Sequence, residues 1–505
     1  MKRIFIFFTF ILLWLNAEAL SLAGIFGEDM VLQQGNETVI WGTSKPGSSV
    51  IVKFRGQKYY KALTNPDGLW ELKINAGKPG GPFELEVKSG NDSIKLTKIF
   101  VGDVWLAGGQ SNMYFKLKNQ LNADKYIEQS IGQNIRYACI TVSTSDRPFA
   151  GQVDWQKITP DNSKWTSAVA YFFVRELGKH INYPIGIISC NRGSASAESW
   201  ISEDRMKNDS RLKVFYDKHV AIANSYPKGE YEQKYAEHKK KMEEYNASLK
   251  NGTPIRWPSE PMGYNHPEFS SGLYKAMLSS IVPTTLKGVI WYQGEANAKD
   301  WEGYRTIFPA LIEDWRCLFR NKDLPFYFVQ LSNFHEPRLH EETWARLREV
   351  QYEVSQTVKN TGMVISIDYG EKKDIHPRNK KPVGKRLAHL ALNKTYGMKI
   401  ADEGPAYKKM KKKGNCIILT FNNTYGGLKI EGEELNGFTV CGKDSVFYKA
   451  TAKITGKNKI TISSPDVHQP KEVRYRFSGW SDGNLYNKEN LPCIPFRTDR
   501  FEIKK

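Results

Sequence analysis

The sequence has few cysteines, and their spacing leaves several classes of protein without support. Six occur among 505 residues, and none of them forms a Cys-x-x-Cys pair. A zinc ribbon, an iron–sulfur protein and a disulfide-dense miniprotein therefore have no basis here. A long apolar run is missing as well, because no stretch after residue 19 reaches the ~20 residues that cross a bilayer as a helix. We expect no transmembrane segment.

Acidic residues are in the minority. The chain has 54 Asp and Glu against 73 Lys and Arg, a formal charge of +19. Such an excess occurs in nucleic-acid binders and also in ordinary basic proteins. The lysines are scattered except for the run Lys408–Lys413, which precedes a strand-like stretch and which we expect to be a solvated loop. Since no zinc finger, RNA-recognition signature or basic zipper accompanies it, we expect no nucleic-acid partner.

The N-terminus has the pattern of a secretory signal peptide. Two basic residues precede an apolar run from Ile4 to Leu15, and Ala17 and Ala19 then occupy the small-residue positions of an A-x-A cleavage site. The run is too short to span a bilayer as an ordinary helix. We expect residues 1–19 to be removed on export to the periplasm or the extracellular space; the alternative is an uncleaved anchor.

Hydrophobic patterning divides the rest of the chain into three parts. Residues 20–98 hold short strand-like runs between Pro- and Gly-rich turns, which predicts a small β-sandwich. Residues 99–404 alternate apolar runs with helical patterns, which predicts a doubly wound α/β domain. Within it, residues 204–257 are rich in Lys, Glu and Tyr and predict a charged helical insertion. Strands return in residues 405–505, which predicts a second β module.

The α/β part contains five continuously apolar runs of the kind that a sheet buried on both faces requires. Apolar residues at helical spacing predict helices at Val169–His180 and Thr343–Val358. Ligands of an open α/β sheet bind beyond the carboxyl ends of its strands. The candidate functional residues are therefore those that directly follow the apolar runs.

Residues with catalytic chemistry follow four of these runs. Ser111 follows the first, in a Gly-Gly-Gln-Ser-Asn turn; its alternative role is a helix cap. Gly193 follows the second and offers a bare N–H, and Asn297 follows the third and offers an amide donor suited to an oxyanion. Asp374 and His376 follow the fifth, where the imidazole can act as general base and the carboxylate can fix its tautomer. Each residue alone has an ordinary structural alternative, but their shared position at successive strand ends indicates one site.

These four positions resemble the blocks of the SGNH hydrolase superfamily. The longer motifs around them resemble the sialate O-acetylesterase family; they are Val101–Met113, Gly288–Ala298 and Asp374–Lys380. The resemblance implies a doubly wound, flavodoxin-like SGNH (GDSL-like) hydrolase domain with a β module on each side. It also implies a secreted carbohydrate esterase that removes O-acetyl groups from glycans, above all from O-acetylated sialic acid.

The resemblance implies a role for each candidate. Ser111 is the nucleophile, His376 is the general base, and Asp374 completes the triad. The backbone N–H groups of Ser111 and Gly193 and the side-chain amide of Asn297 form the oxyanion hole. A Ser-His-Asp mechanism of this kind needs no metal ion and no organic cofactor.

Two departures from the family pattern concern these roles. Many SGNH enzymes carry the triad Asp three residues before the His, where this chain has Lys373; Asp374 stands two residues before it. The segment Asn191–Ser194 stands where relatives often have Trp-Gly-Gly, and Gly193 is the best match in it.

Several alternatives remain open at this point. Gln110 and Gln293 flank the site and either orient substrate or pack within the protein. The expected partner is an O-acetylated glycan, and acetylated xylan or xyloglucan is the alternative substrate. A carbohydrate-binding protein that has lost catalysis is the alternative outside enzymes, although the intact Ser111, Gly193, Asn297 and His376 disfavour it.

Overall fold

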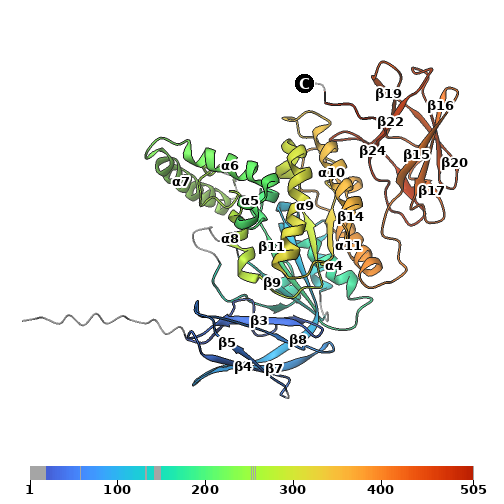
Figure 1. Ribbon diagram of the computed structural model, residues 1–505. Helices are drawn as coiled ribbons and strands as arrows, with labels where there is room; N and C mark the ends of the chain where they lie inside the picture. The colour runs from blue at the N-terminus through green and yellow to red at the C-terminus, as the bar shows by residue number, and fades with distance from the viewer. Residues whose placement is uncertain are drawn as a thin grey trace, which may run out of the picture.

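The computed structural model describes residues 19–503 except 57, 131–133, 142–148, 252, 254, 256 and 257. The expected signal peptide, residues 1–19, lies outside the described residues apart from its last position. Figure 1 shows three parts along the chain: a β module in blue, a central α/β domain, and a second β module in red. Within the described residues, no helix has both the length and the apolar character needed to span a membrane.

The N-terminal module consists of two sheets. The first has the order β1-β3-β6, and the second contains β5, β4, β7 and β8 with β2 beside β8. The strands are β1 (Ser21–Leu22), β2 (Val31–Gln33), β3 (Thr38–Thr43), β4 (Ser49–Phe54), β5 (Lys58–Leu63), β6 (Leu69–Ile74), β7 (Gly80–Ser89) and β8 (Asp92–Gly109).

The 18-residue strand β8 belongs to this module and also to the central sheet. Up to Val101 it pairs antiparallel with β7, and from Asp103 onward it pairs parallel with β11 (Ile185–Asn191). It therefore runs through position 98/99, where the sequence suggested a boundary. The N-terminal module and the central domain share one strand at this point, with no linker between them.

The central sheet has the order β10-β9-β11-β8-β12-β13-β14. All neighbouring pairs are parallel except the short edge pair β10–β9. The remaining strands are β9 (Ile135–Cys139), β10 (Gln156–Lys157), β12 (Gly288–Tyr292), β13 (Phe326–Val329) and β14 (Thr361–Val364). Every residue of β11, β12, β13 and β14 is buried, as the continuously apolar runs predicted.

Helices cover both faces of this sheet. Val104 and Leu106 of β8 face one apolar core, which contains residues of α9 and α10, whereas Trp105 and Ala107 face the other, which contains residues of α4 and α11. The helices are α1 (Ser111–Tyr114), α2 (Ala123–Glu128), α3 (Pro160–Ser163), α4 (Ala168–Leu177), α5 (Glu203–Asn208), α6 (Ser210–Asn224), α7 (Glu230–Lys250), α8 (Gly272–Ala276), α9 (Trp301–Leu318), α10 (Thr343–Thr357) and α11 (Lys381–Lys394).

The two helices predicted from apolar spacing are present as α4 and α10. The charged segment of residues 204–257 forms most of α5 and all of α6 and α7, drawn in green in Figure 1, where α6 and α7 extend away from the body of the molecule. None of the 21 residues of α7 is buried, which agrees with the high charge of this segment.

The C-terminal module contains three small sheets around its own apolar core. Their strands are β15 (Ala406–Lys413), β16 (Cys416–Asn422), β17 (Leu428–Ile430), β18 (Phe438–Cys441), β19 (Phe447–Lys449), β20 (Thr451–Gly456), β21 (Lys459–Ser463), β22 (Glu472–Tyr475), β23 (Leu485–Asn487) and β24 (Phe496–Arg497).

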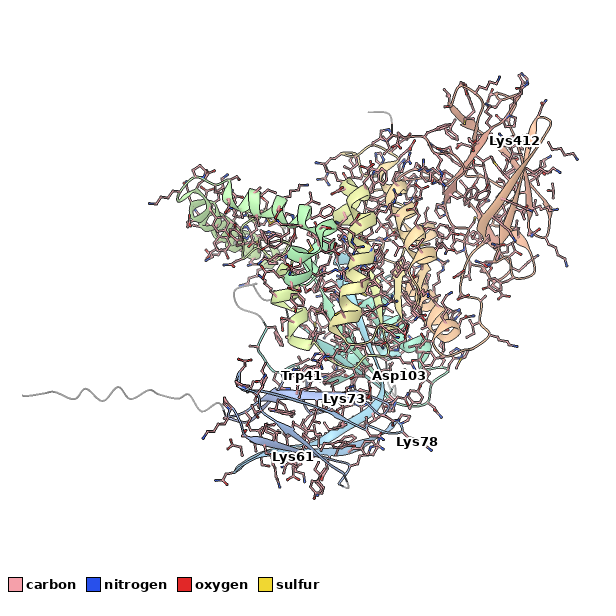
Figure 2. All side chains as sticks on the ribbon, viewed as in Figure 1. Trp41, Lys61, Lys73, Lys78, Asp103 and Lys412 are labelled. Carbon is pink, nitrogen blue, oxygen red and sulfur yellow. The ribbon has the colours of Figure 1, made fainter. Side chains whose placement is uncertain are left out.

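The lysine run Lys408–Lys413 corrects one expectation. It is not a loop but most of the edge strand β15, paired with β16, and its lysines are exposed; Figure 2 labels Lys412 among them. Charged residues on an edge strand discourage pairing with other chains, so a charge run is compatible with a strand in this position.

Candidate active site

The turn after β8 presents Ser111 at the start of α1. Gly109 has φ +134°, and a Cβ atom there would lie 2.2 Å from the carbonyl oxygen of Tyr292, so the turn requires glycine. Gln110 is the N-cap of α1 and Ser111 is its first residue, which removes the cap role that the sequence left open for Ser111. The Ser111 hydroxyl is therefore available at the carboxyl end of β8.

Ser111 and His376 meet in a hydrogen bond. Nε2 of His376 lies 2.8 Å from Oγ of Ser111, although 265 residues separate the two. Burial and the nearby Lys380 lower the pKa of His376, and Asp374 opposes this shift. The imidazole is thus neutral at neutral pH, and its Nε2 can accept the serine proton.

Asp374 lies beside His376, but its hydrogen bond goes to the main chain. Its Oδ1 accepts the backbone N–H of His376 at 2.8 Å, and the same oxygen is 3.7 Å from Nδ1 of the imidazole. About half of the Asp374 side chain is exposed. The carboxylate therefore faces the correct nitrogen at a distance longer than a hydrogen bond.

Gly193 lies next to Ser111. It follows β11, and a Cβ atom built on it would be 3.9 Å from Cβ of Ser111. The preceding N–H, that of Arg192, donates to the carbonyl oxygen of Gly109 at 3.2 Å. This bond joins the end of β11 to the turn at Gly109–Ser111, so the loop at Gly193 stays beside Ser111.

The amide of Asn297 is held by bonds within the protein. Its Oδ1 accepts from the Ala197 N–H at 2.9 Å and from Nε2 of Gln293 at 2.7 Å. Its Nδ2 donates to Glu198 at 2.9 Å, which leaves its second amide hydrogen for another acceptor. These bonds together fix the direction of the amide, with its oxygen toward Ala197 and Gln293 and its nitrogen toward Glu198.

The two glutamines considered for substrate binding also bond within the protein. Oε1 of Gln110 accepts the N–H groups of Gly294 and Ala296, at 3.3 and 3.2 Å. Gln293 is fully buried, and its Nε2 donates to the carbonyl oxygen of Ala195 as well as to Asn297. These contacts join the loop after β12 to its neighbours, which is the packing role left open by the sequence.

Three side chains that were assigned no role lie directly behind the Ser–His pair. Nδ2 of Asn112 donates to Glu295 at 2.5 Å and to the carbonyl oxygen of Ile375 at 3.0 Å, and Lys380 donates to Oδ1 of Asn112. Lys380 is fully buried and Asn112 nearly so. All three stand inside the family-like motifs, and one signal that could have revealed them is Glu295, the single charged residue of the motif Gly288–Ala298.

Comparison with known proteins identifies the family. A sialate O-acetylesterase from Mus musculus is 31% identical over 435 residues, which cover 78% of this chain and 77% of the mouse protein. The chain belongs to the sialate O-acetylesterase family. The human sialate O-acetylesterase is 28% identical and covers 96% of this chain and 94% of its own length. The family model described as "Carbohydrate esterase, sialic acid-specific acetylesterase" matches residues 247–393.

A solved structure supports this assignment over nearly the whole chain. A carbohydrate acetylesterase from Xanthomonas citri superposes with a TM-score of 0.79 at 30% identity and covers 95% of this chain and 100% of its own. The mixed α/β domain with additional β modules is thus shared with a carbohydrate esterase. This member of the sialate O-acetylesterase family is a hydrolase that acts on the O-acetyl esters of carbohydrates.

Proposed function

We propose that the enzyme removes O-acetyl groups from sialic acid through an acyl-enzyme formed on Ser111. The observation that carries the mechanism is the 2.8 Å contact between Nε2 of His376 and Oγ of Ser111, at the carboxyl edge of the sheet where such sites occur. The names of the curated relatives supply the sugar.

The chemistry follows from this pair in two steps. His376 accepts the proton of Ser111 as Oγ attacks the acetyl carbonyl carbon, and the tetrahedral intermediate collapses as the sugar oxygen leaves with the proton from His376. A water molecule then gives a proton to His376 and attacks the acetyl-serine. Collapse of the second intermediate returns the proton to Oγ of Ser111 and releases acetate.

The negative oxygen of each intermediate needs donors close to Ser111. We assign this role to the backbone N–H groups of Ser111 and Gly193 and to the amide hydrogen of Asn297 that Glu198 leaves free. The position of Gly193 beside Cβ of Ser111 supports this assignment. Loss of one such donor typically lowers kcat by ~10²–10³.

Arg192 supports an acidic sugar as the substrate. It precedes Gly193, and its Nη1 is buried, lies 3.7 Å from Oε1 of Glu268 and has no hydrogen-bond partner among the described residues. Burial raises the pKa of Glu268 to about 7 in spite of the nearby guanidinium. Near neutral pH this partner is partly uncharged, which leaves the guanidinium able to pair with the carboxylate of a sialic acid.

The test compares three substrates on the same enzyme. We expect hydrolysis of p-nitrophenyl acetate, and a higher kcat/KM on O-acetylated sialic acid than on acetylated xylan. The variant Arg192→Gln should lose activity on the sialic acid while keeping it on p-nitrophenyl acetate. Absence of all three activities would favour a carbohydrate-binding protein, and a preference for xylan would favour the plant-polysaccharide alternative.

We also infer the export of the protein, the topology of its central sheet and the bounds of its modules. Export after cleavage at residue 19 follows from the N-terminal pattern and is tested by sequencing the N-terminus of the exported protein. The strand order β11-β8-β12-β13-β14 supports the flavodoxin-like arrangement of an SGNH domain, with β9 and β10 added at one edge. The modules are proposed as residues 20–98, 99–404 and 405–505, with β8 common to the first two.

A further inference from the structure

The amide of Asn112 can adopt only one orientation. Its amide nitrogen donates to the carboxyl group of Glu295 and to the carbonyl oxygen of Ile375, and its amide oxygen accepts from Nζ of Lys380. Reversing the amide would face two acceptors with an oxygen and a donor with an NH₂ group. The three partners therefore fix both the position and the direction of this side chain.

The contacts of Asn112 connect the two halves of the catalytic pair. Asn112 directly follows Ser111 in the chain, and its partner Ile375 directly precedes His376. The hydrogen bond between Asn112 and Ile375 thus joins the chain neighbour of Ser111 to the chain neighbour of His376. Because the carboxylate of Asp374 is half exposed and 3.7 Å from Nδ1, the imidazole depends on such main-chain contacts for its position.

We propose that Asn112, Lys380 and Glu295 are positioning residues that hold His376 within hydrogen-bond distance of Ser111. This inference rests on the proposed Ser111–His376 mechanism. Lys380 acts through Asn112 by fixing its amide oxygen, and Glu295 acts on the other side by accepting from its amide nitrogen. None of the three needs to touch the substrate.

The cost of this arrangement indicates that it does not serve stability alone. Lys380 is fully buried, with its ammonium 4.9 Å from the ring centre of Phe115 and 5.6 Å from that of Tyr292. One oxygen of Glu295, Oε2, is buried without a hydrogen-bond partner in the described part of the chain. Apolar residues of similar volume are often at least as stable as a buried charged pair. A hydrogen-bonded polar network instead specifies one arrangement of the groups that it joins.

Lys380 also influences the base through its charge. Together with burial it lowers the pKa of His376, and Asp374 raises it. The charged groups that face Lys380 are Glu295, Asp374 and Glu371. Burial lowers the pKa of Lys380 itself to about 7, so Lys380 carries its charge in the acidic range where His376 titrates. Removal of that charge should therefore raise the pKa of His376, so that the acid limb of kcat/KM moves to higher pH.

The experiment measures Asn112→Ala, Lys380→Met and the double variant with p-nitrophenyl acetate. We expect each single change to lower kcat by roughly 10- to 100-fold with KM within about twofold, because small misplacements of reacting groups cost up to ~10² in rate. The double variant should lose much less than the product of the two losses, since both residues act through one network. In Lys380→Met the acid limb should shift upward.

Two controls separate this role from a general structural effect. Lys381→Met removes the exposed lysine next to Lys380 and should leave kcat and the pH profile unchanged. Asn112→Asp keeps the shape of the side chain while removing its donors, and it replaces Asn112→Ala if that variant does not fold. Met has a length similar to that of Lys and can pack between the rings of Phe115 and Tyr292, and a melting curve of Lys380→Met shows whether the variant is folded.

The outcomes are distinct. Folded variants with kcat within threefold of wild type would overturn the proposal, and so would losses that multiply in the double variant or a pH profile that does not move. Ser111→Ala is measured beside them. If Ser111→Ala remains active, the mechanism itself fails; if it is inactive while the network variants are normal, the mechanism stands and the positioning role falls.

Discussion

The two ends of the parallel half of β8 carry polar groups in contrasting states. Asp103, at the start, is fully buried and accepts four hydrogen bonds. The donors are two glutamines of the N-terminal module and two tyrosines of the central domain: Gln33, Gln34, Tyr183 and Tyr396. Ser111, just past the other end, is partly exposed and bonded to His376.

Asp103 therefore belongs to the junction between the N-terminal module and the central domain, whereas Ser111 belongs to the candidate active site. All four donors remain available to Asp103 across the ordinary pH range, because burial together with the Asp103 carboxylate raises the pKa of Tyr183 to about 12 and raises that of Tyr396 further. Figure 2 labels Asp103 where the blue module meets the central domain. The Asp103 carboxylate, whose oxygens each accept two hydrogen bonds, stabilises the junction. The partly exposed Ser111 hydroxyl, bonded to His376, can still approach a substrate.

The largest effect should come from Ser111, the proposed nucleophile. Ser111→Ala should lower kcat by more than ~10³, since losses in a catalytic triad are of this size or greater. Thermal unfolding should not change, because the hydroxyl is partly exposed and makes one bond in the structure. The measurement is the rate of acetate release beside a melting curve, and activity above ~1% of wild type would exclude Ser111 as nucleophile.

His376→Ala should be nearly as damaging, with a loss of about 10³ or more in kcat. In the wild type, kcat/KM should fall on the acid side below the ordinary histidine value of ~6.5, because burial and Lys380 lower the pKa of the base and protonation removes its acceptor. The matched control is His389→Ala, a half-buried histidine on α11 that bonds to Glu176. Equal losses in the two variants would contradict a special role for His376.

At the other end of the strand the effect should appear in stability. Asp103→Ala removes the buried acceptor of four donors, of which Gln33 is buried and the other three are half-buried, and should lower the free energy of unfolding by about 3 kcal/mol. Below the unfolding transition kcat should stay near the wild-type value. Denaturant unfolding and a rate measurement on the same sample check both statements; a large loss of kcat in folded protein would show that the two ends are not independent.

Asp374→Asn should have the smallest effect of the four. The carboxylate is half exposed and 3.7 Å from Nδ1, so solvent screens it, and Asn can still accept the His376 N–H. We expect kcat to fall by about 10- to 100-fold, or ~1.4–2.8 kcal/mol. A loss below tenfold leaves a Ser111–His376 dyad, and a loss of thousands-fold would mean that the carboxylate closes onto Nδ1 during catalysis.

The sequence predicted those features that depend on local pattern. Continuous apolar runs gave the central strands, and apolar spacing gave α4 and α10. The sequence placed Ser111 and His376 at one edge because each follows a strand of one sheet, and the carboxyl ends of parallel strands share an edge; in the structure the two side chains are in contact. The adjacency of Gly193 to Ser111 follows in the same way.

Other features depend on partners far away in the chain. The sequence did not predict that β8 is continuous, because its hydrophobic pattern changes at Ile99. Before this residue the strand is mostly exposed, and after it the strand is buried in the central sheet. The pairing of β15 with β16 makes a strand of a lysine run that has low strand propensity by itself. The direction of the Asn297 amide depends partly on Ala197 and Glu198, which lie about 100 residues away in the chain, and no local pattern encodes these contacts.

The strand shared by the N-terminal module and the central domain also limits how such a protein can change by recombination. A crossover at residues 98/99 would fall inside β8, and the incoming segment would have to continue both the antiparallel register with β7 and the parallel register with β11. A one-residue slip would turn Val104 and Leu106 from one core to the other and displace the turn that carries Ser111. A recombination that preserves this fold must therefore exchange the N-terminal module together with the whole of β8, including the end that leads to Ser111.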